Sequence, residues 1–139
     1  MTEEQNKEVV KKLIEEAIIK GNLDVVKELV TEDMEDKNPF PGQPEGLEGQ
    51  IFHIKTLRTS FPGQKVEYSL FADGDTVVEE WRGMGENTGP FLNQPATGKY
   101  VDYSGITIFE LKDGKIISRR SYADSMVLLK QLGLIPNNH

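Results

Sequence analysis

The sequence predicts an α+β domain in which three N-terminal helices pack on one face of a strongly curved antiparallel sheet and a short helix ends the chain. Three observations lead to this class. Apolar residues recur at helical spacing through the first 61 residues. From Val66 onward they alternate with polar residues, as in half-buried strands. The pairs Asp73-Gly74 and Asp113-Gly114 divide that second part into hairpins. At 139 residues, we expect a single domain over residues 1–139.

The helical part carries its own start and stop signals. Thr2 and Gln5 have the spacing of a capping box, so a helix begins there, and Gly21 ends it. Asn22 is the predicted cap of a second, shorter helix.

Residues 32–46 contain three prolines and are predicted to form a loop. A third helix is predicted over residues 47–61, where Pro62-Gly63 ends it.

The hairpin turns predict which side chains share a face of the sheet. If Asp113 and Gly114 form a two-residue loop, Leu111 pairs with Ile116. The same register then places one set on the helix-covered inner face: Tyr103, Gly105, Thr107, Phe109, Ser118, Arg120, Tyr122 and Asp124. At the first hairpin, Val66 is predicted to pair with Trp81, and the inner set is Val66, Tyr68, Leu70, Val77, Glu79 and Trp81.

Composition narrows the possible partners. The net charge is −7 and the pI is about 4.9, which disfavours nucleic acid and anionic membranes as partners. The chain has no cysteine and only two histidines, which excludes thiolate chemistry and disfavours a multi-histidine metal site. No stretch of the sequence has the length and apolarity of a membrane span or of a signal peptide, so we expect a cytoplasmic protein.

Short matches along almost the whole chain resemble one known family. They are Asn6-Lys7-Glu8-Val9-Val10, Gly21-Asn22-Leu23-Asp24, Gly46-Leu47-Glu48-Gly49, Thr88-Gly89 with Pro95-Ala96-Thr97-Gly98, Ser104-Gly105-Ile106, and the run from Asp113-Gly114-Lys115-Ile116 to Leu132-Gly133. In this order and spacing they are similar to the SnoaL-like polyketide (ester) cyclases of the nuclear-transport-factor-2-like superfamily. The resemblance implies a cone-shaped α+β barrel with a deep apolar pocket. It also implies a homodimer through the sheet and an intramolecular aldol closure without metal or cofactor. By position, Asp124 resembles the aspartate that serves these cyclases as general acid and base.

The chain also differs from the family at polar positions. Lys37 and Asn87 stand where members often have histidine, and Ile14 stands where a tyrosine is common. Ser118-Arg119-Arg120 replaces a frequent Glu-His-Trp.

Asp124 is the first candidate catalytic residue, and its position allows two interpretations. A carboxylate that lines an apolar cavity loses hydration, so its pKa rises toward the range useful for proton transfer. Equally, Asp124 precedes Ser125 and an apolar run, which is the place of a helix N-cap.

The other candidates are binding residues, each with a structural alternative. Glu79 is either a functional carboxylate buried on the inner face, or a glutamate that reaches the rim or faces outward because the predicted register is wrong. Arg120 either pairs with a carboxylate or binds an acidic ligand group. His53 is either a proton shuttle or an ordinary helix residue. Five aromatic side chains form either the walls of a ligand pocket or part of the core: Trp81, Tyr68, Tyr103, Phe109 and Tyr122.

Three functions therefore remain open. The first is a cofactor-independent enzyme that uses acid/base chemistry on a small apolar carbonyl or ester compound. The second is a non-catalytic protein that binds a small hydrophobic molecule. The third is a structural dimer, for which the outer-face residues Ile106, Ile108 and Ile117 are the expected interface.

Overall fold

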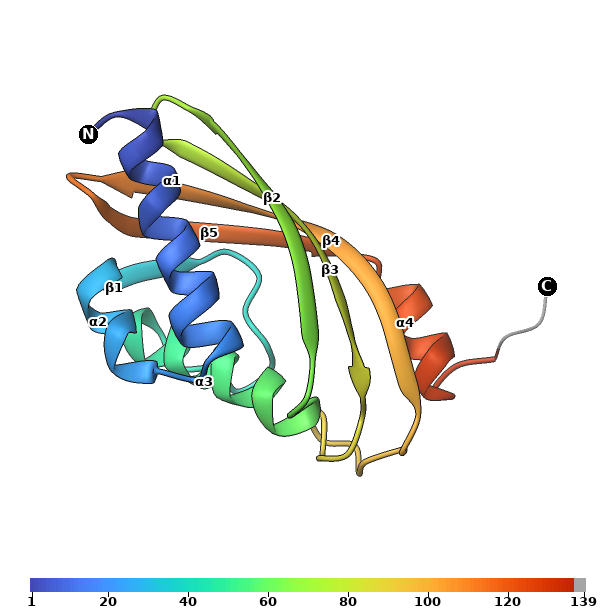
Figure 1. Cartoon of the computed structure of the whole chain (residues 1–139). Coiled ribbons are helices and arrows are strands. Elements are labelled where there is room, and N and C mark those ends of the chain that lie inside the picture. The colour runs from blue at the N-terminus through green and yellow to red at the C-terminus, as the bar shows by residue number, and fades with distance from the viewer. Residues whose placement is uncertain (137–139) are drawn as a thin grey trace.

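The computed structural model describes residues 1–136 and confirms the α+β class. Four α-helices, two short helices of other types and five strands follow one another (Figure 1). In chain order they are α1 (Glu3–Lys12), η1 (Leu13–Ile19), η2 (Leu23–Val25), α2 (Val26–Leu29), β1 (Val30–Asp36), α3 (Gly46–Ser60), β2 (Lys65–Asp73), β3 (Thr76–Glu86), β4 (Tyr100–Lys112), β5 (Lys115–Ala123) and α4 (Ser125–Leu132).

The first helix starts as its sequence predicts. The Thr2 side chain accepts a hydrogen bond from the Gln5 amide, and the Gln5 side chain accepts one from the Thr2 amide, which completes the capping box. The helix then continues as the π-helical segment η1, which the apolar periodicity did not predict. The chain turns at Gly21, whose φ of +82° is strained for residues with a side chain.

A strand, β1, overlaps the first part of the segment that was predicted as a loop. β1 pairs in parallel with β5, with Val30 opposite Ile116 and Asp36 opposite Arg119. The prediction failed because the strand sequence VTEDMED is mostly polar, and only Val30 and Met34 are buried in it. β1 thereby brings the carboxylate of Asp36 to the sheet.

The five strands have the order β1-β5-β4-β3-β2, so the sheet is open, with β1 and β2 as its edges. In the first hairpin Asp73 pairs with Thr76, and Gly74 and Asp75 form the loop. The register therefore differs by two residues from the prediction, and Val66 pairs with Gly83 instead of Trp81. A shift of two preserves the faces, so Glu79 and Trp81 remain on the inner face as predicted.

The second hairpin contains a β-bulge that overturns part of the prediction. Leu111 pairs with Ile116 as expected, but Glu110 pairs with Ser118, so Ile117 is an extra residue. Every later residue of β5 is consequently turned over. Arg120 and Tyr122, predicted inside, are exposed on the outer face, and Arg119 is buried instead.

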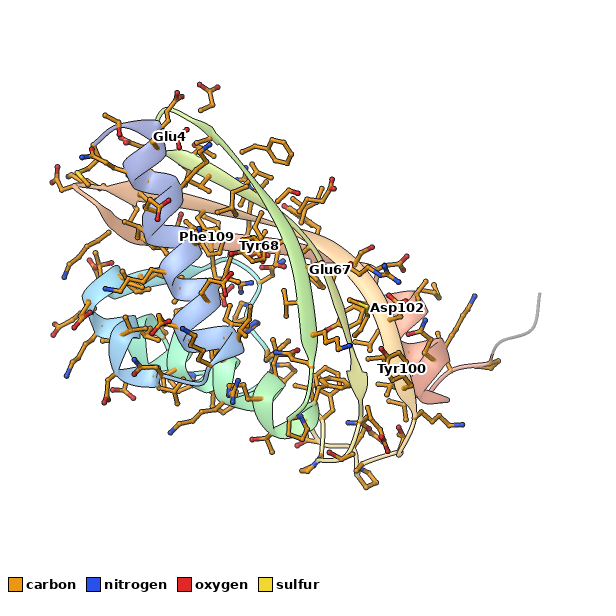
Figure 2. The ribbon with its side chains drawn as sticks, viewed as in Figure 1. Glu4, Glu67, Tyr68, Tyr100, Asp102 and Phe109 are labelled. Atoms are coloured by element: carbon orange, nitrogen blue, oxygen red, sulfur yellow. The ribbon has the colours of Figure 1, made fainter. Side chains whose placement is uncertain are left out.

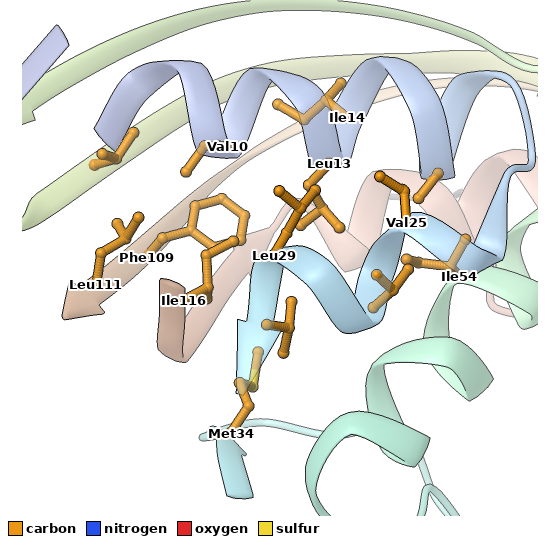
Figure 3. Packing of buried hydrophobic residues seen from close by; sticks show 14 residues of the cluster. Val10, Leu13, Ile14, Val25, Leu29, Met34, Ile54, Phe109, Leu111 and Ile116 are labelled. Carbon is orange, nitrogen blue, oxygen red and sulfur yellow. The ribbon is translucent and has the colours of Figure 1, made fainter. Parts of the chain in front are cut away.

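The main core lies between the inner face of the sheet and the helices α1, α2 and α3 (Figure 1). Phe109, Leu111 and Ile116 from β4 and β5 meet Val10 and Leu13 from the N-terminal helix (Figure 3). A second cluster joins the ends of α3 and β4 to α4; it comprises Phe61, Phe91, Val101, Leu128 and Leu132. Within residues 1–136, no helix combines the length and the apolarity needed to cross a membrane.

Gly105 lets β4 pass closely beneath the indole of Trp81. A Cβ atom at this position would lie 2.5 Å from Trp81 Cζ2 and 2.8 Å from the Tyr122 carbonyl oxygen. We therefore expect Gly105→Ala to lower the free energy of unfolding by about 1–3 kcal/mol through overpacking. Gly63→Ala is the matched control, because no atom lies within 4 Å of its added Cβ. Urea unfolding of both variants checks this, and equal stability of the two would contradict it.

Candidate functional site

Glu79 is the most unusual side chain of the inner face. It lies on β3, between Leu70 of β2 and Thr107 of β4, and only 5% of it is exposed. Within residues 1–136, no side chain or backbone group forms a hydrogen bond or an ion pair with its carboxylate. The Glu79 oxygens are not among the fully buried atoms that lack a partner within residues 1–136, so they keep some contact with solvent. A largely buried glutamate without a protein partner is still costly, so this position is a candidate for function.

Burial raises the pKa of Glu79 from its usual value of 4.5 to about 7, although the positive charge of Arg119 acts in the opposite direction. A carboxyl group with a pKa near neutrality exists in both forms in the cell. It can therefore accept a proton from a substrate and return it, as general acid/base catalysis requires.

Polar groups continue across the sheet beside Glu79. The indole Nε1 of Trp81 donates a hydrogen bond to Thr107 Oγ1 at 3.0 Å. The hydroxyls of Thr107 and Ser121 lie 3.0 Å apart, also within hydrogen-bonding distance. These contacts hold Trp81 in place and leave the carboxylate of Glu79 free.

A buried ion pair on the same inner face joins β1 and β5. Arg119 Nη1 is 3.0 Å from Asp36 Oδ2, and the two side chains are 9% and 6% exposed. Asp36 also accepts hydrogen bonds from Gln43 Nε2 (3.0 Å), Gln50 Nε2 (3.2 Å) and the Asn38 amide (3.2 Å). Burial raises the pKa of Asp36, but Arg119 and these donors outweigh it, so the net pKa is below the usual value.

His53 of α3 lies close to this ion pair. Its ring stacks on Phe40, with the ring centroids 4.2 Å apart, and its Nδ1 is buried without a hydrogen-bond partner among the described residues. Burial lowers the pKa of His53 to about 3; Arg119 lowers it further and Asp36 opposes this. His53 is therefore a neutral imidazole at physiological pH.

The predicted aromatic residues lie in different environments. Trp81 and Tyr103 meet edge to face with ring centroids 5.4 Å apart, both half-buried on the inner face, and burial raises the pKa of Tyr103 to about 12. Phe109 is a core residue, 2% exposed. Tyr68, on the side of the sheet that faces α1 (Figure 2), donates a hydrogen bond to Glu15 at 2.5 Å. Trp81, two residues along β3 from Glu79, and Tyr103, which contacts Trp81, are half-buried aromatic residues of the inner face, whereas Tyr122 is 62% exposed on the outer face.

Asp124 lies outside this cluster. Its side chain accepts a hydrogen bond from the Val127 amide at 3.2 Å and caps α4, and the residue is exposed. Together with Tyr122 and Arg82 it borders a hollow of about 710 Å³ on the outer side of the sheet. The inward orientation predicted for Asp124 is therefore wrong, for the same reason as for Arg120 and Tyr122: the bulge at Ile117 turns the end of β5 over.

The sequence analysis missed Asp36, Gln50 and Arg119 as members of this cluster. Asp36 was assigned to a loop, and Arg119 was placed on the outer face. One signal was present for Arg119, because the chain has two adjacent arginines where the strand alternation can bury only one.

We expect Glu79→Gln to change the pH dependence of stability. Because folding raises the pKa of Glu79, the folded state loses stability as pH rises from about 4.5 to about 7, where the carboxyl ionises more readily in the unfolded chain. The stability of Glu79→Gln relative to the wild type should therefore increase over this window by up to about 3 kcal/mol and stay constant above it.

Unfolding curves at a series of pH values measure this difference, and the comparison with wild type removes the opposite contribution of His53. Glu80→Gln is the control, since the neighbouring Glu80 is exposed. A pH-independent difference between wild type and Glu79→Gln would contradict the raised pKa.

Comparisons with known proteins agree with this architecture. The family model of SnoaL-like polyketide cyclases matches residues 8–132. The chain shares 32% sequence identity with a candidate SnoaL-like polyketide cyclase from Jannaschia sp. CCS1. The crystal structure of that protein superimposes with a TM-score of 0.84, and the match covers 96% of this chain and 95% of that chain. A candidate polyketide cyclase from Bacillus cereus ATCC 10987 is 26% identical, with a TM-score of 0.81, over 95% of this chain and 83% of that chain.

TsrD from Streptomyces laurentii shares the fold at 21% identity, with a TM-score of 0.87, over 97% of this chain and 99% of that chain. A comparison with curated proteins finds no significant match. The family match over residues 8–132, together with the helix-covered open sheet, shows that the chain belongs to the SnoaL-like polyketide cyclase family.

Proposed function

We propose that this protein is a small-molecule enzyme of the cyclase or isomerase type, in which Glu79 moves a proton at a carbon atom next to a carbonyl group. The observation that carries the proposal is the buried, unpartnered carboxylate of Glu79 beside Trp81 on the inner face. Membership of the SnoaL-like family supports the class of reaction. No metal or cofactor is needed in this scheme.

The proposed reaction starts with a substrate that packs against Trp81 and Tyr103. The C–H bond next to the carbonyl breaks, its proton goes to a Glu79 oxygen, and the electron pair moves onto the carbonyl oxygen. The resulting enolate then either takes the proton back from Glu79 at a conjugated carbon (isomerisation), which restores the carboxylate, or forms a bond from its carbon to a second carbonyl carbon (aldol closure). In the aldol case the new alkoxide takes the proton back from Glu79, which restores the carboxylate.

The surroundings of Glu79 favour this role over a structural one. A general base works best when its pKa is close to the working pH, and burial brings the pKa of Glu79 to about 7. Trp81 and Tyr103 on the same face are half-buried, and aromatic surfaces of this kind suit a flat apolar compound. By contrast, Asp124 is exposed and its carboxylate is used as a helix cap.

We expect Glu79→Gln to abolish proton transfer. The measurement is hydrogen–deuterium exchange at the α-carbon of ethyl benzoylacetate, followed by NMR in deuterated buffer. A single positioned acid/base contributes about 100- to 10,000-fold, so the catalysed exchange rate should fall by that factor. Glu80→Gln, one residue away on the outer face, should retain the wild-type rate.

Asp124→Asn tests the role that the family resemblance assigns to Asp124. If Asp124 acts only as a cap, the variant loses about 1 kcal/mol of stability or less and keeps its exchange activity. Loss of exchange in Asp124→Asn with full activity in Glu79→Gln would move the catalytic role to Asp124. Exchange no faster than in buffer for the wild type would favour the non-catalytic binding protein.

We also propose that two copies associate through the outer face of the sheet. Apolar side chains are exposed there, among them Phe71 (58%), Ile106 (40%) and Ile117 (36%). Such a patch suits a two-fold interface. Ile106→Asp should therefore convert a dimer to a monomer in sedimentation velocity, and a monomeric wild type would contradict the proposal.

A further inference from the structure

We propose that Arg119 is the oxyanion-binding residue of the inner-face site, so that the substrate is a carbonyl compound whose negatively charged oxygen lies against the Arg119 guanidinium. This inference rests on the proposed function, and it names the chemical class of the substrate.

Most hydrogen-bond donors of the Arg119 guanidinium are not used within the described part of the protein. It can donate five hydrogen bonds, but within residues 1–136 it forms only the one from Nη1 to Asp36 Oδ2. Buried arginines that serve structure alone usually satisfy more of their donors, often with a bidentate carboxylate. The single-nitrogen contact leaves Nε and Nη2 available for a ligand oxygen.

Asp36 fixes Arg119 without competing for its remaining donors. The Asp36 carboxylate already accepts from Gln43, Gln50 and the Asn38 amide as well as from Arg119. The carboxylate is therefore held at the end of β1, and it holds the arginine in turn. Preorganised donors of this kind stabilise a developing oxyanion most effectively.

His53 provides a second, independent sign of a ligand. Its Nδ1 is buried and lacks a hydrogen-bond partner in the described part of the chain, although its ring is held by stacking on Phe40. Arg119 and Glu79 lie on the same face of the sheet, on the two strands that flank β4: Glu79 pairs with Thr107 and Arg119 with Phe109. His53 lies on α3, one turn beyond Gln50, whose side chain is hydrogen-bonded to Asp36. Three polar groups with unused hydrogen-bonding capacity therefore lie on or against the same inner face: Glu79, Arg119 and His53.

The charges of these groups suit a reaction that creates an oxyanion. When Glu79 takes a proton from carbon, it loses its negative charge, and the carbonyl oxygen gains one. The total charge around Arg119 stays the same, so the guanidinium stabilises the product of the step without leaving a buried charge unpaired.

A stable anion should therefore bind together with one proton. The groups that face Glu79 are Arg119 from β5, Thr107 from β4, and Tyr68 from β2, whose phenol is hydrogen-bonded to Glu15 of η1. Of these, only Arg119 carries a positive charge. An anion next to an ionised Glu79 would be repelled, so binding should require the protonated form.

Benzoate and benzamide are the probes, because they have nearly the same shape and differ in charge. Binding is followed by the fluorescence of Trp81, the only tryptophan of the sequence. At pH 6 the wild-type protein should bind benzoate at least about tenfold more tightly than benzamide. Above the pKa of Glu79 the benzoate affinity should fall by about tenfold per pH unit, while the benzamide affinity stays constant. Equal binding of the two probes at pH 6, or no benzoate binding up to millimolar concentration, overturns the inference.

Two variants locate the anion site. Arg119→Gln combined with Asp36→Asn removes both charges, so that no buried charge is left unpaired, and it should lose the preference for benzoate while retaining benzamide binding. Arg120→Gln is the matched control on the exposed outer face and should bind benzoate like the wild type. If Arg120→Gln loses the preference instead, the inference is wrong. Should the double variant fail to fold, the comparison of the two probes across pH in the wild type still decides.

The exchange assay and the binding assay together test the proposed function and this inference separately. If α-proton exchange depends on Glu79 but benzoate and benzamide bind equally, the enzyme assignment stands and Arg119 is a structural residue. If benzoate binding depends on Arg119 but Glu79→Gln leaves exchange unchanged, the anion site stands and Glu79 is not the base.

Discussion

The buried ion pair between Asp36 and Arg119 is the contact on which the inner-face site depends. It joins the edge strand β1 to β5, which are far apart in sequence, and Gln43 and Gln50 connect it to the loop before α3 and to α3 itself. Removing one partner of such a pair leaves an uncompensated buried charge, which typically costs about 3–5 kcal/mol. Arg119 therefore serves both stability and the site, because it holds β1 through Asp36 and also places a positive charge on the inner face that carries Glu79.

In two pairs of adjacent identical residues, one member is buried on the inner face and the other is exposed. Glu79 and Glu80 are adjacent on β3, and Arg119 and Arg120 are adjacent on β5, yet strand alternation buries the first of each pair and exposes the second. The composition of the chain does not distinguish the members of a pair. Burial does, since it raises the pKa of Glu79 to about 7. The same amino acid is thus a candidate catalyst at one position and a solvated surface charge at the next.

The sequence allowed the fold class, the capping box and the inner position of Glu79 to be predicted, because these follow from periodicity and turn chemistry. The position of Arg119 was not predictable in this way. A single extra residue, Ile117, reverses the faces of the rest of β5, and no composition signal marks a bulge. β1 was missed because its pairing with β5 is long-range and its sequence is polar. The errors therefore concentrate where tertiary pairing, and not local pattern, decides the orientation of side chains.

The central claim is that Glu79 is a buried carboxyl group that takes a proton from the substrate and returns it. It is tested most directly by the ionisation of this residue in the folded protein. Carboxyl carbon chemical shifts of ¹³C-labelled protein, with the resonance of Glu79 assigned by its loss in Glu79→Gln, give that titration. The account predicts a midpoint near pH 7, well above the usual 4.5 of a glutamate. A midpoint at 4.5 would show that Glu79 is an ordinary ionised side chain, and the proposed mechanism would not stand.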